Sequence, residues 1–369
     1  MFRLITHTIW KRTFFLNAAI ILCGSVSSDV AHQAQPKIIT ERPMKAELVL
    51  KIGSDKENED FFKPGSFAID RSGRIFILDS GNSRIQCFSN EGKFQFSFGR
   101  RGQGPGEISN QASKIKIPND GNLYVIDNRP RRINVYNLEG KYQHSIKITR
   151  YYDDIVLLNK TYYLCSILLH NNFKPIDFTK ASGKIEGSFG VFIEPSVGLV
   201  KRVDRLPFPP PWRCLYMGGT FTNLIVTPKN ELIYSQGNPY RLIKYDSGGH
   251  VLKDILGHVG FDTYAHVEFI IEKDGVAVKT NQARTYHMSI NVNDQLIVPF
   301  INQKKDFIFI DIYNLDLNLI SRHKMPNCIF DNKKKEQFRN IIIDDDYLYG
   351  LVISQYDPAC LVKYKLIFD

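Results

Sequence analysis

Apolar and polar residues alternate along this chain in short runs, and turn residues rich in glycine separate the runs. Residues 67–99 contain four such runs, with turns at 70–73, 80–83 and 90–92 between them. An alternation with period two predicts strands that bury one face, and closely spaced turns favour an antiparallel meander. Glycine suits these turns because it adopts positive φ without steric cost.

The same pattern returns 48 residues later, at residues 115–147. A fixed period of this length indicates β modules that must stack on one another to bury their apolar faces. The pairs that align at this offset are Gly73 with Gly121, Asp79 with Asp127, Arg84 with Arg132, Ile85 with Ile133, and Gly92 with Gly140.

Weaker copies of the module follow, and they bring the total to six. They start at about Ile155, Leu224, Tyr286 and Asn340. Longer connectors separate some of them, at 191–220 and 257–285, and the second connector contains a hairpin signal of its own at Asp274-Gly275.

The sixth copy has room for only three strands before the sequence stops. Glu47–Ile52, followed by Gly53, resembles the fourth strand of the other modules. We therefore expect an all-β fold over residues 45–369: a six-bladed β-propeller of four-stranded antiparallel blades, closed by the N-terminal strand. Closure of the ring protects sheet edges that would otherwise invite aggregation.

The first 28 residues are typical of a signal peptide. Lys11 and Arg12 precede the apolar run Phe14–Leu22, and small residues follow it. Residues 29–44 then form a linker. Cys23 offers an alternative, because the residues before it resemble a bacterial lipobox, although Leu22 is larger than the residue usual at that position. Both interpretations predict an exported protein, either periplasmic or lipid-anchored at the cell envelope.

Composition adds little chemistry to this picture. Hydrophobic residues make up 43% of the chain and aromatic residues 12%, which suits a large β core. Six cysteines form no CxxC pair, and the nine histidines form no HxH or HExxH motif. We therefore expect buried free thiols at Cys87, Cys165 and Cys360, no metal site and no cofactor.

The first two modules resemble NHL repeats. The matching segments are 70–73, 77–85 and 98–99, and the glycine-rich connector 102–107 is similar to the inter-blade linker of that family. The whole chain is similar to exported six-bladed β-propeller proteins, often lipoproteins, of Bacteroidota. The resemblance implies the fold firmly and the function loosely, because propellers host binding modules, lyases and lactonases.

Two functional hypotheses follow. The first is a non-enzymatic, monomeric binding module of the cell envelope, whose partner is an envelope protein or an anionic or saccharide ligand. The second is a metal-dependent lyase or lactonase with its site at the channel mouth. A signal segment argues against nucleic acid as a partner, and any membrane contact would come through a lipid anchor.

The expected fold also assigns loops to faces. In a propeller, the loops between second and third strands share one face with the connectors between blades, and we call this the connector face. Basic residues gather in those loops and acidic residues in the opposite turns, so we expect binding on the connector face. The candidate binding residues are Arg100, Arg101, Arg129, Arg131, Trp212, Arg213, Tyr240 and Arg241.

Two other motifs have structural interpretations. Asp79 with Arg84, and Asp127 with Arg132, bracket equivalent hairpin loops, where we expect ion pairs or turn-capping contacts rather than ligand groups. The connector Gly102–Glu107 resembles a phosphate-binding loop, but it does not lie between a strand and a helix, so we expect an inter-blade crossing.

Overall fold

A computed structural model gives the structure of this chain. It describes residues 40–53, 60–166, 174–191, 222–237, 240–257, 266–272, 275–281, 284–301, 306–327, 337–354 and 357–368. All of these belong to one unit, Ala34–Asp369.

Three four-stranded antiparallel sheets form the first half of this unit. Each sheet is a meander in sequence order, as the alternating pattern predicted. Blade 1 comprises β2 (Ser66–Ile69), β3 (Ile75–Asp79), the 3-10 helix η1 (Ser80–Asn82), β4 (Arg84–Phe88) and β5 (Phe94–Phe98). Blade 2 comprises β6 (Ala112–Lys116), β7 (Leu123–Asp127), β8 (Arg132–Tyr136) and β9 (Tyr142–Lys147). Blade 3 comprises β10 (Asp154–Leu158), β11 (Thr161–Cys165), β12 (Ile176–Thr179) and β13 (Ile185–Phe189).

The second half repeats this plan with longer strands. Blade 4 comprises β14 (Thr222–Val226), β15 (Leu232–Gly237), β16 (Tyr240–Tyr245) and β17 (Val251–Leu256). A separate hairpin follows, β18 (His266–Glu272) with β19 (Gly275–Asn281), as the hairpin signal predicted. Blade 5 has a split inner strand, β20 (Arg284–Thr285) and β21 (Ser289–Ile290), then β22 (Gln295–Ile301), β23 (Phe307–Asn314) and β24 (Leu319–Pro326). Blade 6 comprises β25 (Gln337–Asp344), β26 (Tyr347–Ile353) and β27 (Cys360–Phe368), with β1 (Glu41–Ile52) as its outer strand.

The N-terminal strand closes the last blade, which confirms the sequence prediction. β1 pairs antiparallel with β27 from Met44 to Ile52. It is longer than predicted, because Glu41–Pro43 also pair in parallel with Arg322–Lys324 of β24 in blade 5. One strand therefore completes blade 6 and joins it to blade 5.

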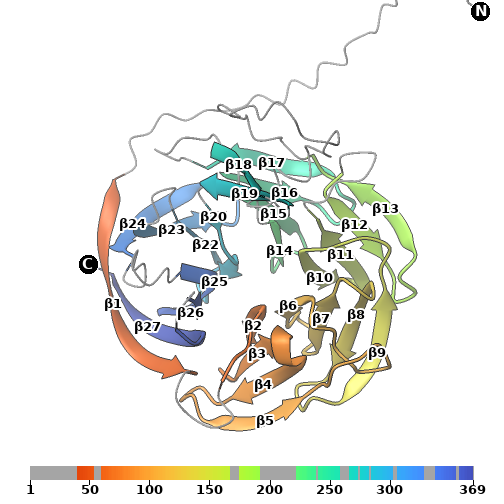
Figure 1. Cartoon of the computed structure of the whole chain (residues 1–369). Helices are drawn as coiled ribbons and strands as arrows, with labels where there is room; N and C mark the ends of the chain where they lie inside the picture. The colour runs from red at the N-terminus through yellow and green to blue at the C-terminus, as the bar shows by residue number, and fades with distance from the viewer. Residues whose placement is uncertain are drawn as a thin grey trace, which may run out of the picture. The chain divides into compact units, whose positions relative to one another are not determined.

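The blades surround a common centre, with β2, β6, β10, β14 and β25 innermost and β5, β9 and β13 outermost (Figure 1). The hydrophobic core lies between neighbouring blades. For example, Phe76 and Leu78 of blade 1 share a buried cluster with Ile115 and Val125 of blade 2. Burial of this apolar surface holds adjacent sheets together. The six-bladed, all-β architecture is confirmed.

Glycine is needed where the tight turns reverse the chain. Gly73 and Gly121 have φ of +80° and +74°, and their amides donate to the carbonyls of Asp70 and Pro118 at 2.9 and 3.1 Å. The equivalence of these two turns explains the repeated glycine spacing.

Cys87, Cys165 and Cys360 are buried and form no disulfide, as expected. Across the described ranges, no helix has the length and apolar character needed to cross a membrane.

Candidate functional site

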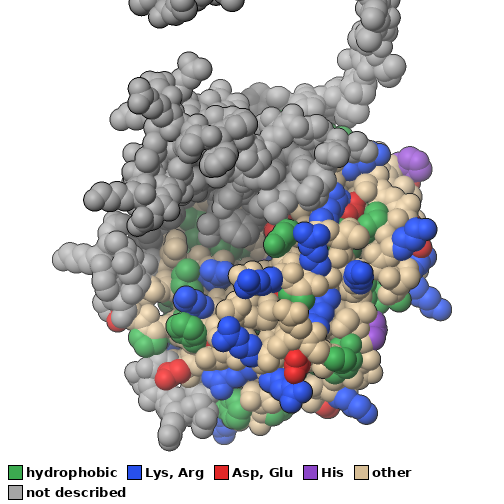
Figure 2. Space-filling view, turned by 45° about the vertical axis from the view of Figure 1, so that its right-hand side comes forward, with side chains coloured by type: hydrophobic (Ala, Val, Ile, Leu, Met, Phe, Trp, Pro, Cys, Tyr) green, Lys and Arg blue, Asp and Glu red, His purple; other side chains and the backbone are tan. Residues whose placement is uncertain are grey.

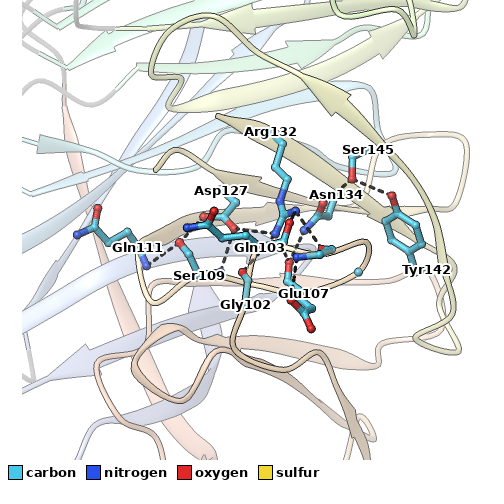
Figure 3. Close-up of polar contacts among 12 residues, drawn as sticks. Gly102, Gln103, Glu107, Ser109, Gln111, Asp127, Arg132, Asn134, Tyr142 and Ser145 are labelled. Carbon is cyan, nitrogen blue, oxygen red and sulfur yellow. Dashed lines mark hydrogen bonds and ion pairs between the residues drawn. The ribbon is translucent and has the colours of Figure 1, made fainter. Parts of the chain in front are cut away.

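Arg132 holds the glycine-rich connector between blades 1 and 2 (Figure 3). Its guanidinium group donates to the carbonyl oxygens of Gln103, Gly104 and Glu107 at 2.5, 3.0 and 2.6 Å. Asn134 Nδ2 adds a bond to the Glu107 carbonyl at 2.8 Å. The connector therefore presents carbonyl groups to a cation of the protein itself, which is the opposite of a phosphate cradle built from N–H groups.

Asp127 fixes the segment that leads into β6. This carboxylate is fully buried and accepts from the Ser109 amide at 2.9 Å, and Arg132 lies 3.8 Å from it. We call Asp127, Arg132 and Asn134 the connector clasp. Glu107 closes the loop by accepting from the Gly104 amide at 2.8 Å, and this hydrogen bond is the main cause of its lowered pKa.

Blade 1 has a related arrangement on its own connector. Buried Asp79 accepts from the Phe62 amide at 2.8 Å and pairs with Arg84 at 2.9 Å. Arg84 also donates to the Asp60 carbonyl at 3.1 Å. The repeated Asp–Arg pairs are thus ion pairs that anchor connectors. The sequence analysis predicted this structural role for them.

The four candidate arginines around this connector are exposed, but they differ in their contacts. Arg100 pairs with Glu107 at 2.9 Å, and Arg131 donates to the Thr149 carbonyl at 3.1 Å. Arg101 and Arg129 have exposed side chains with no ion pair to any described residue. The surface in Figure 2 shows many Lys and Arg side chains over the described part of the molecule and fewer acidic ones.

The structure places Tyr240 and Arg241 inside the protein rather than on an open face, in contrast to the sequence prediction. Only 4% of each residue is exposed. Tyr240 donates to Asp311 Oδ2 at 3.2 Å, and Arg241 pairs with Asp254 of the neighbouring strand β17. Both polar groups have hydrogen-bond or ion-pair partners within the sheets. Their role in the structure is therefore to hold strands together. Trp212, Arg213 and Cys23 lie outside the described residues.

The acidic residues of the opposite turns include several local caps. Asp70 accepts from the amides of Ser72 and Arg74 at 2.9 and 2.8 Å, and Asp246 accepts from Gly248 and His250 in the same manner. Carboxylates in such turns stabilise the turn backbone.

A polar cluster that the sequence analysis did not identify lies on the inner strands, and we call it the central cluster. Lys114 Nζ is 2.9 Å from His287 Nδ1 and 3.5 Å from Asn223 Oδ1. Its members are Lys114 and Lys116 on β6, Asp154 on β10, Asn223 on β14, and His287 between β20 and β21. The cluster therefore joins the inner edges of four blades.

Lys116 makes two short hydrogen bonds within this cluster. Its Nζ donates to Asp154 Oδ2 and to the Leu224 carbonyl, both at 2.7 Å. Asp154 also accepts from the amides of Ile155 and Leu224 at 2.9 and 3.0 Å. Burial opposes ionisation of Asp154, but the charges of Lys116 and Lys114 prevail and hold its pKa well below the usual value.

For Lys114 and His287, the charge of Asp154 does not outweigh burial. Burial is the main cause of the lowered pKa of Lys114; the charge of Asp154 raises that pKa, and the charge of Lys116 lowers it. Burial, followed by the charges of Lys114 and Lys116, brings the pKa of His287 well below its usual value, so its ring is neutral near pH 7. The contact with Lys114 then makes Nδ1 the acceptor and leaves the ring proton on Nε2.

One signal in the sequence points to this cluster in retrospect. At the offset of 48 residues, Lys114 and Lys116 replace Ser66 and Ala68 of blade 1. Two lysines at alternate positions of an inner strand depart from the repeat. Their partners are 38 to 173 residues away in the chain, so sequence spacing alone did not reveal the contacts.

The chemistry that these side chains offer is recognition of charge. Within the described ranges, no group of three or more His, Cys, Asp or Glu side chains could share a metal ion. The central cluster instead offers ammonium groups, a neutral imidazole and an amide.

Known proteins resemble this chain in both sequence and fold. A family model described as a 6-bladed beta-propeller, DUF5128, matches residues 68–183. A 56-residue segment is 41% identical to mouse Tripartite motif-containing protein 3, and it covers 15% of this chain but only 8% of the mouse protein.

Two solved structures extend the comparison over most of the chain. A DUF4221 family member from Bacteroides vulgatus superposes with a TM-score of 0.58 at 11% identity, over 89% of this chain and all of that one. Virginiamycin B lyase from Staphylococcus aureus gives a TM-score of 0.47 at 13% identity, over 89% and 100% of the two chains. The likeness to the Bacteroides vulgatus protein is one of fold, and the chain is an all-β, six-bladed propeller.

Proposed function

We propose that this propeller is a non-enzymatic binding module whose connector face recognises an anionic ligand. The observation that carries the proposal is the difference between two sets of arginines on that face. Arg132 and Arg84 are used to hold connectors, whereas Arg101 and Arg129 are exposed without an ion pair to any described residue. Arginine suits carboxylate, sulfate and phosphate groups because its planar fork donates two parallel hydrogen bonds.

The proposal is tested with dextran sulfate as an anionic saccharide and dextran as its uncharged counterpart. We expect retention of the protein on dextran sulfate but not on dextran, and weaker retention as salt rises. The double variant Arg101→Glu/Arg129→Glu should bind dextran sulfate at least about tenfold more weakly, because two attractive contacts become repulsive.

The matched control reverses two charges in turns of the opposite face. Arg71 and Lys93 are exposed there, so Arg71→Glu/Lys93→Glu changes the net charge equally. Equal losses in both double variants would mean that only net charge matters, and this would contradict a connector-face site. Binding to dextran as strong as to dextran sulfate would contradict recognition of an anion.

We further propose that the protein acts outside the cytoplasm, which the charged and apolar segment around Phe14–Leu22 supports. Expression of the full chain in a Gram-negative host, followed by mass spectrometry of the envelope fraction, tests this. Processing after Ser28 would support a cleaved signal, and a lipid-modified N-terminus at Cys23 that Cys23→Ser abolishes would support an anchor. An unprocessed chain in the cytoplasm would contradict both.

A further inference from the structure

The central cluster carries an unbalanced charge at the centre of the ring. Lys116 and Asp154 form an ion pair at 2.7 Å and compensate each other. The hydrogen-bond partners of Lys114 are His287 Nδ1 and Asn223 Oδ1, both uncharged acceptors. Lys114 has no ion pair with a described carboxylate, and an ammonium group partly withdrawn from water without such a pair is costly to fold around, so its position calls for an explanation.

Lys114 also retains capacity for a ligand. An ammonium group has three N–H donors. One points to His287 at 2.9 Å, and a second makes only a long contact to Asn223 at 3.5 Å. The side chain of Lys114 is partly exposed, so a small molecule can reach it, whereas its neighbours His287 and Asn223 are buried with 8% and 4% exposed.

We propose that the central cluster binds a small molecule through a monocarboxylate group, with Lys114 as the main contact. Lys114, Lys116 and Asp154 together leave one positive charge in the central cluster, which one carboxylate would neutralise. Asp153 lies outside the cluster and accepts a hydrogen bond from Thr222 at 3.4 Å. A phosphate dianion would instead leave excess negative charge beside Asp154. This proposal does not depend on the connector-face arginines, so either site can be disproved without the other.

The expected change in protonation of Lys114 on binding also fits a carboxylate ligand. Burial lowers the pKa of Lys114, and a bound carboxylate would favour its ammonium form again. The titratable groups that act on Lys114 are Lys116 on the same strand, Asp154 on β10, and Asp153 and the Cys165 thiol of blade 3, whose own pKa burial raises. We therefore expect proton uptake with the ligand, and tighter binding as pH falls toward neutrality from the alkaline side.

The experiment compares acetate with acetamide, which has the same shape and no charge. Titration calorimetry at constant ionic strength should show acetate binding at least tenfold more tightly than acetamide and than inorganic phosphate. Repeating the titration in buffers of different ionisation enthalpy should reveal proton uptake. Lys114→Met, which keeps the length of the side chain, should weaken acetate binding at least tenfold, and Lys93→Met at an exposed turn should not.

Each outcome bears on the proposal. No acetate binding, acetamide binding equal to acetate, or unchanged affinity in a folded Lys114→Met variant would overturn it. Tighter binding of inorganic phosphate would overturn the choice of a monocarboxylate. If Lys114→Met fails to fold, the acetate, acetamide and phosphate comparison on the unaltered protein still decides the outcome.

Discussion

At the residue scale, buried charges in this propeller serve two different ends. In the connector clasp, every strong contact of Arg132 is made to its own chain, so the charge fixes the path of a connector. Arg132 also has the buried carboxylate of Asp127 3.8 Å away. In the central cluster, Lys114 bonds only neutral acceptors among the described residues. Both side chains are basic, so the residue type alone does not tell the structural role from the proposed binding role. The distinction comes from whether a partner of opposite charge lies within reach.

The connector clasp makes a prediction about stability. Arg132→Met should lower the free energy of unfolding by about 3 kcal/mol, because it leaves several connector carbonyls without donors. Arg129→Met, at an exposed neighbouring position, should change it by less than about 0.5 kcal/mol. Urea unfolding followed by circular dichroism measures both variants. Equal effects would show that the clasp contributes no more than surface charge.

At the element scale, the strands follow from alternation and the turns from glycine. The two repeats with clear glycine spacing were predicted nearly to the residue, because each turn is decided by local backbone preference. The burial of Arg241 was not predicted, because it depends on Asp254 in the adjacent strand. A short-range pattern cannot show which side chain a neighbouring strand supplies.

Gly121 and Gly183 have nearly equal φ but different surroundings, so substituting each by alanine distinguishes the cost of backbone strain from the cost of steric crowding. Gly121 has φ +74° and open space where a Cβ would lie, so Gly121→Ala should cost only the backbone penalty of about 1 kcal/mol. Gly183 has φ +75°, but a Cβ there would lie 2.1 Å from the Lys147 carbonyl oxygen of blade 2. Gly183→Ala should therefore cost about 2–4 kcal/mol. Urea midpoints measure the difference, and equal costs would contradict the proposed crowding.

At the scale of the whole molecule, the order of blades and their closure were predictable from one repeat and one missing strand. The central cluster was not, since Lys114 and His287 are 173 residues apart and lie in blades 2 and 5. The parallel pairing of β1 with β24 was also missed, because residues 41–43 lie before the repeat pattern begins.

The double pairing of β1 predicts a graded loss of stability on truncation. A chain that starts at Met44 keeps the pairing with β27 but loses the pairing with β24, so its melting temperature should fall by a few degrees. A chain that starts at Gly53 also loses buried Met44 and Ile52 and should melt roughly 10 °C lower or aggregate. A chain that starts at Thr40 is the control. Equal melting of all three would contradict closure by β1.

The pairing of β1 with β27 also sets an order of events during biogenesis. β1 precedes every other strand that the structure describes, and its partner β27 follows them all. Until β27 has been made, β1 has no partner in blade 6 and the two ends of the ring are unjoined. Contacts between such distant segments form slowly, because the chain loses the entropy of loop closure before the strand pairing stabilises it. A propeller organised in this way stays open until β27 is available, and it closes only when β27 pairs with β1.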